Sequence, residues 1–97
     1  MVPDTDITVL ALNSGSSSLK FGLFRLVDST LVTLLTGDAD AIGSAHSRFG
    51  VKDAAGNVAA NTEIHIVDQR AAMNCVVEAL VAAGMPTPTA IGHRMVH

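Results

Sequence analysis

Side chains and backbone groups that could bind phosphate are concentrated in residues 13–20, Asn-Ser-Gly-Ser-Ser-Ser-Leu-Lys. Gly15 allows the backbone to turn tightly and present free N–H groups, and the four serines add hydroxyl donors around them. Phosphate oxygens are bound by such donors, and Lys20 adds a positive charge. The segment therefore indicates a phosphate-binding turn. An ordinary serine-rich hairpin loop is the alternative, because Gly, Ser and Asn dominate turns for local reasons.

The residues on either side must position this turn. Residues 7–12 form a β-branched, nearly all-apolar run, which is typical of a strand buried on both faces, and residues 21–27 form a second apolar run. A lysine after such a turn can follow the charge of a transferring phosphoryl group, and the Asn13 amide can bond a phosphate oxygen or a metal-bound water. The segment matches neither the GxxxxGK[ST] nor the GxGxxG phosphate-binding pattern.

A second group of chemically capable residues ends the chain, in Gly92-His93-Arg94-Met95-Val96-His97. We expect Arg94 directly after a short strand over 90–92, where a guanidinium can reach a crevice and hold a carboxylate or phosphate bidentately. A surface arginine paired with an acid is the alternative. His93 and His97 are four residues apart, which along a strand separates them by about 13 Å, too far to share one metal ion.

Composition narrows the class of protein. The 97-residue chain is 48% hydrophobic, enough for one small domain, and contains nine acidic and six basic residues. The basic residues are scattered, which argues against nucleic acid as a partner. No apolar run has the roughly 18 residues of a membrane span, and the first residues lack the features of a secretory signal. The single cysteine, Cys75, is expected to be a small packed residue. Because one cysteine cannot form an internal disulfide and no secretory signal is seen, the expected location is the cytoplasm.

Taken in order, the elements predict a mixed α/β sheet. Gly22, in the second strand, predicts a bulge or a close approach by a ligand or another backbone. The segment 37–50 has a mixed composition, and a short helical turn over 40–45 is one interpretation of it. The two aspartates of this segment, Asp38 and Asp40, are expected to be solvated rather than to bind metal. The predicted strands are 7–12, 21–27 and 31–36 in an antiparallel meander, 47–51 and 57–66 as a hairpin, and 90–92 returning parallel to the first.

One helix is clearly marked, over residues 69–83. Asp68 is its expected N-cap, and Gly84 before Met85-Pro86 is its expected end. The i, i+3, i+4, i+7 spacing predicts an apolar face that packs on the sheet and consists of Met73, Val76, Val77 and Leu80.

Two strings of residues resemble motifs of a known family. Residues 9–20, Val-Leu-Ala-Leu-Asn-Ser-Gly-Ser-Ser-Ser-Leu-Lys, resemble the N-terminal motif of acetate kinase and its propionate and butyrate kinase relatives. Residues 90–97, Ala-Ile-Gly-His-Arg-Met-Val-His, resemble the family's second motif, which there continues into Gly-Gly. The two motifs occur in the family's order at opposite ends of the chain. Members are several times longer, so the chain resembles the first part of one.

The resemblance implies a fold and a set of site residues. The family has a duplicated ribonuclease-H-like fold, shared with sugar kinases and actin-like ATPases, with a cleft between two domains. Residues 1–97 would be the N-terminal part of the first domain, and the second domain is absent. On the nucleotide side of the implied site, Asn13 helps to order the magnesium–phosphate assembly, Ser16 and Ser18 line the phosphate loop, and Lys20 approaches the ATP phosphates. On the acyl side, Arg94 contacts the acyl substrate and the phosphoryl group, and Val96 lies at the pocket for the acyl methyl group.

The implied activity is reversible transfer of the γ-phosphoryl group of ATP, with Mg²⁺ or Mn²⁺, to acetate, which gives acetyl phosphate and ADP. The whole enzyme would be a homodimer, and the 97 residues alone would be inactive because other site residues lie beyond them. Propionate or butyrate could replace acetate. A non-catalytic phosphate-binding or assembly module is the alternative of a different class. An actin-like or chaperone ATPase fits less well, since those proteins carry an aspartate at the position of Asn13.

Overall fold

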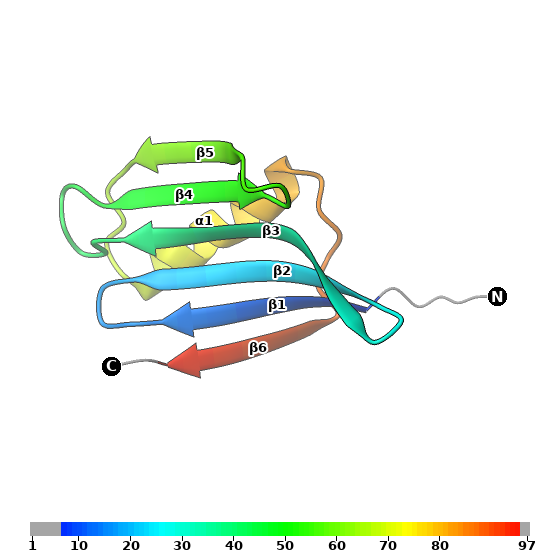
Figure 1. Ribbon diagram of the computed structural model, residues 1–97. Helices are drawn as coiled ribbons and strands as arrows, with labels where there is room; N and C mark the ends of the chain where they lie inside the picture. Colours follow the sequence, from blue (N-terminus) through cyan, green and yellow to red (C-terminus); the bar gives the residue numbers. More distant parts are fainter. Residues whose placement is uncertain (1–6, 96–97) are drawn as a thin grey trace.

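The computed structural model describes residues 7–95, and the side chains of residues 7–92. One six-stranded sheet and one helix make up this part of the chain (Figure 1). The strands follow each other across the sheet in the order β5-β4-β3-β2-β1-β6. The elements are β1 Ile7–Ser14, β2 Leu19–Val27, β3 Thr30–Asp40, β4 Arg48–Asp53, β5 Val58–Glu63, α1 Gln69–Ala82 and β6 Ala90–Met95.

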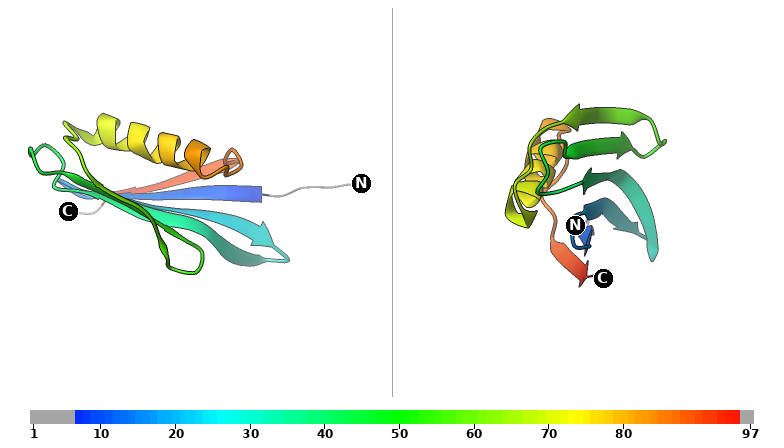
Figure 2. Two further views of the ribbon diagram at one scale, coloured as in Figure 1. Left: turned by 90° about the horizontal axis from the view of Figure 1, so that it is seen from above. Right: turned by 90° about the vertical axis from the view of Figure 1, so that its left-hand side faces the viewer.

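Strand pairing confirms the predicted mixed α/β sheet. β1 to β5 form an antiparallel meander, whereas β6 pairs with β1 in parallel. A parallel return needs a crossover, and α1 supplies it by lying across one face of the sheet (Figure 2). No element of the described residues covers the opposite face, which we call the open face.

The core lies between the sheet and α1. In β1, Thr8, Leu10 and Ser14 are buried on the helix side, while Ile7 and Asn13 are exposed on the open face. The expectation that this strand is buried on both faces is therefore wrong for the described chain, because only one face is covered. The buried hydrophobic core consists of Leu10, Leu19, Phe21, Leu23, Leu35, Ala39, Phe49, Val51, Ile66, Ala72, Val76 and Leu80.

The ends of α1 are where the sequence places them. The Asp68 side chain accepts a hydrogen bond from the backbone N–H of Ala71 at 2.9 Å and caps the N-terminus. Gly84 has a φ of 69°, and Met85 donates its N–H to the Leu80 carbonyl at 2.9 Å. This hydrogen bond, with a left-handed glycine after the C-cap, is the Schellman arrangement that ends many helices.

The buried stripe of α1 differs in part from the predicted one. Val76 and Leu80 are buried as expected, and Ala72 is buried with them. Met73 is half-buried, but Val77 is 48% exposed. Cys75 and Ala79 also pack against the core, so the buried face is turned toward these residues and away from Val77, where the predicted face is wrong.

The segment between β3 and β4 was the least regular in the sequence, and its predicted helical turn is not formed. β3 continues to Asp40, and residues 41–47 follow as a series of turns. Ser47 is fully buried and organises these turns: its hydroxyl lies 2.9 Å from the carbonyl oxygens of both Ala41 and Ser44. It also accepts a hydrogen bond from the Ile66 N–H at 3.2 Å.

We expect Ser47→Ala to lower the free energy of unfolding by about 2 kcal/mol, because it leaves the buried Ile66 N–H without its acceptor. Urea unfolding followed by circular dichroism measures this. Ser44→Ala is the matched control, since Ser44 is exposed and its hydroxyl, within the part of the chain that the structure describes, accepts a hydrogen bond only from the exposed His46 N–H. Equal stability of the two variants would contradict the role of Ser47.

Gly22 shapes the second strand of the sheet. A Cβ at Gly22 would lie 2.6 Å from the ring of Phe24, so the absence of a side chain lets this ring lie against the strand. The β2–β3 register shifts immediately afterwards, between Leu23 and Phe24. The predicted irregularity of the strand is therefore present next to Gly22, but the group that approaches the glycine is a side chain of the same strand, not a ligand or another backbone.

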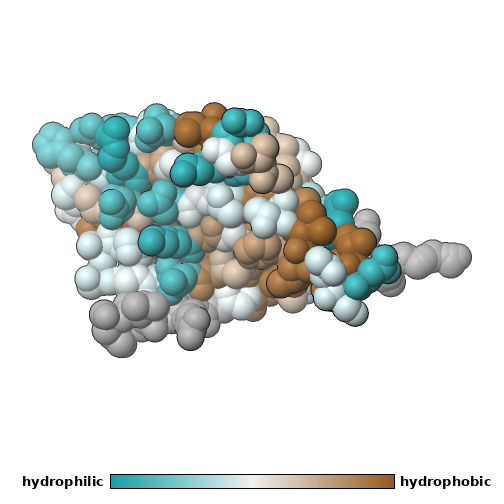
Figure 3. All heavy atoms as spheres, viewed as in Figure 1, coloured by the Kyte–Doolittle hydropathy of each residue, from teal (hydrophilic) through white to brown (hydrophobic). Residues whose placement is uncertain are grey.

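Exposed hydrophobic side chains gather at the tip of the β2–β3 hairpin (Figure 3). Val27, Leu31 and Val32 are 42–56% exposed there. This tip follows the last residue of β2, whereas Lys20 lies near its first residue. The apolar tip and the candidate phosphate-binding turn are thus at opposite ends of the strand.

Candidate functional site

The phosphate-binding turn is a tight hairpin loop between β1 and β2. Ser14 pairs with Leu19 and closes the loop, so that only residues 15–18 lie outside the strands. Asn13 and Lys20 therefore belong to strands, not to the turn as the sequence suggested. Strand pairing holds their backbones more firmly than a loop would. Across the loop, the Gly15 N–H donates to the Ser18 carbonyl at 2.9 Å.

Strand register brings the predicted polar residues into one row across the sheet. Asn13 is the direct cross-strand partner of Lys20, and both side chains are exposed on the open face. Asp38 is the partner of Lys20 on its other side. The backbone of Arg94 is the parallel partner of Asn13, within β6 and not after a strand ending at residue 92 as predicted. The side chain of Arg94 and the whole of Val96 lie outside what the structure describes.

The two serines assigned to the phosphate loop differ in exposure. Ser16 is exposed and Ser18 is half-buried. In the described part of the chain, the backbone amides of Ser16 and Ser17 donate no hydrogen bond to protein groups. Consecutive free N–H groups in a turn attract anions, so the local geometry suits phosphate oxygens.

The open face carries a hollow of about 650 Å³ beside this loop. Its floor is made by small residues that are neighbours in register: Ala11 pairs with Gly22 on one side and with Gly92 on the other. A Cβ at Gly92 would meet no atom within 4 Å, so this part of the floor is open. Asn13, Lys20, Phe24 and Thr36 also line the hollow.

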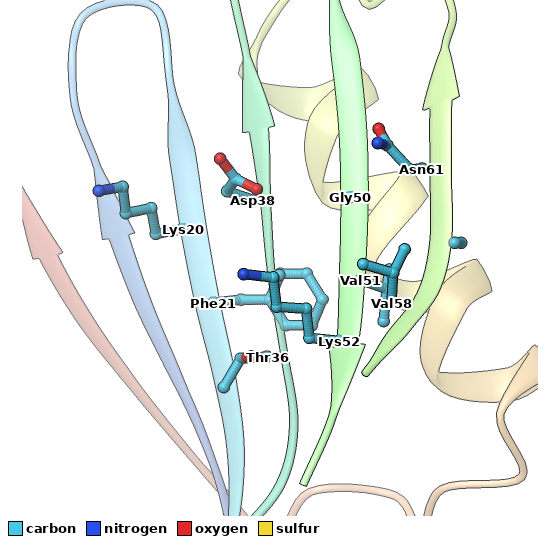
Figure 4. Close-up of a pocket in the computed structure, with 11 residues that line it drawn as sticks. Lys20, Phe21, Thr36, Asp38, Gly50, Val51, Lys52, Val58 and Asn61 are labelled. Carbon is cyan, nitrogen blue, oxygen red and sulfur yellow. The ribbon is translucent and has the colours of Figure 1, made fainter. Parts of the chain in front are cut away.

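A second hollow, of about 480 Å³, extends from Lys20 across β3 and β4 to β5 (Figure 4). Lys52 and Asn61 line it together with Asp38. Figure 4 shows these side chains on the face of the sheet opposite α1. Lys20 contributes to both hollows and is therefore the central charged group of the open face.

Metal binding needs separate consideration. Among the side chains that the structure describes, those of residues 7–92, no group of three or more His, Cys, Asp or Glu could hold a metal ion. Asp40 instead accepts a hydrogen bond from the Ala41 N–H at 3.1 Å, and Asp38 is exposed. Magnesium is commonly held by substrate phosphates, waters and one or two protein oxygens. Asn13 fits such a role better than that of a direct ligand in a protein cage.

Cys75 lies on α1 and takes no part in the open face. It is half-buried, and burial, followed by the negative charge of Glu78, raises the pKa of its thiol above the ordinary value. A raised pKa keeps the thiol protonated and unreactive near neutral pH. This agrees with the prediction of a packed residue.

Two contacts of the loop were not expected from the sequence. The Gln69 side chain donates to two carbonyls of the loop, and the Ile42 N–H donates to the Ser17 carbonyl at 2.9 Å. The sequence predicts only that Gln69 begins the helix. Neither contact has a sequence signal, since both join segments far apart in the chain.

Comparison with known proteins identifies the family. The model of the acetokinase family matches residues 8–97, nearly the whole chain. This chain belongs to the acetokinase family. It is 40% identical over 95 residues to the acetate kinase of Streptomyces griseus and 38% identical over 93 residues to that of Streptomyces avermitilis. These alignments cover 92% of the chain but only 23% and 22% of the two relatives.

Solved structures agree with the family. A propionate kinase from Francisella tularensis superposes with a TM-score of 0.77 at 28% identity, covering 94% of this chain and 23% of its own. The fold also matches an acetate kinase from Porphyromonas gingivalis, with a TM-score of 0.78 and 24% identity. The described sheet is thus part of the acetokinase fold, as predicted. Among residues 7–95, no helix is long and apolar enough to span a membrane.

Proposed function

We propose that this chain is the N-terminal part of an acetate kinase, which transfers the γ-phosphoryl group of ATP to acetate and forms acetyl phosphate and ADP. The observation that carries the proposal is the row of Asn13, Lys20 and the backbone of Arg94 beside a loop whose Ser16 and Ser17 amides donate to no group of the described residues. Membership of the acetokinase family supports it. The chain would contribute the phosphate-binding part of the first domain, and a cytoplasmic homodimer remains the expectation for the whole enzyme.

Each residue has a distinct part in this proposal. MgATP, when bound, supplies the phosphoryl group and the metal charge that offsets part of its negative charge. The amides of Ser16 and Ser17, with the hydroxyls of Ser16 and Ser18, donate to phosphate oxygens. Lys20 follows the charge of the moving phosphoryl group. Asn13, directly across from it, orients a phosphate oxygen or a metal-bound water.

Arg94 and Val96 are proposed for the acyl side of the reaction. The backbone of Arg94 adjoins Asn13, which is consistent with a guanidinium that holds both the carboxylate and the phosphoryl group. Two anions repel each other, and a cation between them lowers the cost of their approach. Val96 would contact the acyl methyl group.

The test is an assay of the longer protein encoded in the same reading frame. Acetate and MgATP should yield acetyl phosphate, trapped as the hydroxamate, and mixing ADP with acetyl phosphate should yield ATP. The 97-residue chain alone, assayed in parallel, should produce neither. A full-length protein without acyl phosphate formation, but with saturable ATP binding, would instead favour a non-catalytic phosphate-binding module.

Propionate is the second candidate substrate, because a propionate kinase is among the similar solved structures. Comparison of kcat/KM for acetate, propionate and butyrate decides between them. We expect acetate to give the highest value, in line with the acetate kinases that are 38–40% identical to this chain. A higher value for propionate would reassign the substrate and leave the proposed phosphoryl transfer intact.

A further inference from the structure

The loop of residues 15–18, called the serine loop below, is bound by a residue that lies outside both sequence motifs. Gln69, the first residue of α1, donates from Nε2 to the carbonyl oxygen of Gly15 at 3.1 Å and to that of Ser18 at 3.2 Å. A side-chain amide nitrogen carries two hydrogens, so it can serve both carbonyls at once. Because carbonyls only accept, the nitrogen rather than the oxygen of the amide must face them.

Two backbone hydrogen bonds also bind carbonyl groups of the loop. The Ser17 carbonyl accepts from the Ile42 N–H at 2.9 Å, and the Ser18 carbonyl also accepts from the Gly15 N–H. The carbonyls of Gly15, Ser17 and Ser18 are therefore all bound to protein donors. A carbonyl oxygen turned toward an anion would repel it, whereas a free N–H attracts it. Because these carbonyls are bound to protein donors, the amides of Ser16 and Ser17 are the loop groups available to a ligand.

Gln69 is itself fixed in position. Asp68 caps α1 one residue earlier, so the helix start cannot shift without losing the hydrogen bond to Ala71. The buried residues of the same helix, Ala72 and Val76, anchor it to the sheet. The helix thus provides a rigid base from which one side chain spans the loop between its first and last residues.

We propose that Gln69 is a positioning residue that holds the serine loop in the conformation that binds ATP phosphates. It acts through Gly15 and Ser18 and does not itself touch the nucleotide. The contribution of Gln69 to catalysis rests on the proposed kinase function. The hydrogen bonds by which Gln69 positions the loop do not depend on that function. The two claims can therefore be tested separately.

Gln69→Met is the primary variant, because methionine has similar length and good helix propensity but no hydrogen-bond donor. We expect hydrogen exchange at the Gly15 and Ile42 amides to become about tenfold faster, as two hydrogen bonds of ordinary strength are lost. In the longer kinase, kcat/KM for MgATP should fall about tenfold. The KM for acetate should stay within about twofold, because the acyl site does not include the loop.

Gln69→Glu separates positioning from helix stability. A carboxylate in the first turn of a helix interacts favourably with its dipole, so α1 should be no less stable than in the wild type. The same carboxylate would repel the two loop carbonyls, and kcat/KM for MgATP should fall further than in Gln69→Met. A loss of activity with undiminished thermal stability is an outcome that a purely structural role for Gln69 would not produce.

Arg70→Met is the matched control, one residue along the same helix turn, exposed and away from the loop contacts. It should leave exchange and kinetics as in the wild type. Unchanged exchange at Gly15 and Ile42 in Gln69→Met would overturn the proposal. If the wild-type protein formed no acetyl phosphate, the kinase function would fail, and the exchange measurement would still decide the role of Gln69.

Discussion

Replacing Lys20 by methionine lowers kcat/KM for MgATP about a hundredfold in the longer kinase, mainly through kcat. Removing one fixed donor or charge that stabilises a transition state commonly costs this much. Lys20 begins β2, is exposed on the open face, and lines both hollows there. Its backbone is paired on both sides, with Asn13 and Asp38, so the ammonium group operates from a rigid base. Steady-state kinetics with MgATP varied at saturating acetate measures the effect.

Lys52→Met is the matched control for this prediction. Lys52 carries the same charge on the same face and lines the same 480 Å³ hollow, two strands away from Lys20. It has no place in the row that contains Asn13 and the backbone of Arg94. We expect its kcat/KM to remain within about twofold of the wild type. Equal losses in the two variants would show a general effect of charge on ATP attraction, and would remove Lys20 from the proposed site.

Replacing Gly37 by alanine should destabilise the fold more than the same replacement at any other glycine of the described sheet. Gly37 pairs with Phe21 on one side and Val51 on the other, in the centre of the sheet. An added Cβ would lie 2.5 Å from the Phe21 ring and would also meet the backbone carbonyl oxygen of Gly50. A ring can rotate away, but a backbone atom of a paired strand cannot, so the β3–β4 pairing must open. We expect a loss of about 3 kcal/mol in the free energy of unfolding.

Urea unfolding of the 97-residue chain, followed by circular dichroism, measures this loss. Gly50→Ala, on the neighbouring strand, is the control: its Cβ would meet only the Asp38 Oδ1 atom at 3.6 Å and the Ala60 carbonyl oxygen at 3.9 Å. These are ordinary contacts, so we expect a change below about 1 kcal/mol. If Gly37→Ala unfolded at the same urea concentration as Gly50→Ala, the close packing of β3 against β4 would be disproved.

Much of the fold follows from local patterns that act over a few residues. Asp68 and Gly84 mark the ends of α1 because capping depends on side chains adjacent in sequence. The antiparallel meander follows from apolar runs separated by short turns, which leave neighbouring strands little choice of partner. Residues 37–50 lack a sustained periodicity, so local patterns do not determine their structure. The end of β3 and the turns after it depend instead on the buried Ser47 and its distant partner Ile66.

The composition and spacing of residues 13–20 and 90–97 were enough to predict a phosphate-binding turn, an arginine after a strand that could bind a carboxylate or phosphate, and a resemblance to the acetokinase family. Only the tertiary structure placed Asn13, Lys20 and the backbone of Arg94 in one row, because the parallel register of β1 and β6 depends on a helix crossover. Gln69 had no signal at all, since a hydrogen bond to a carbonyl 54 residues away leaves no local pattern. Residue types and short spacings determine which chemistry is available, and long-range packing decides which groups meet.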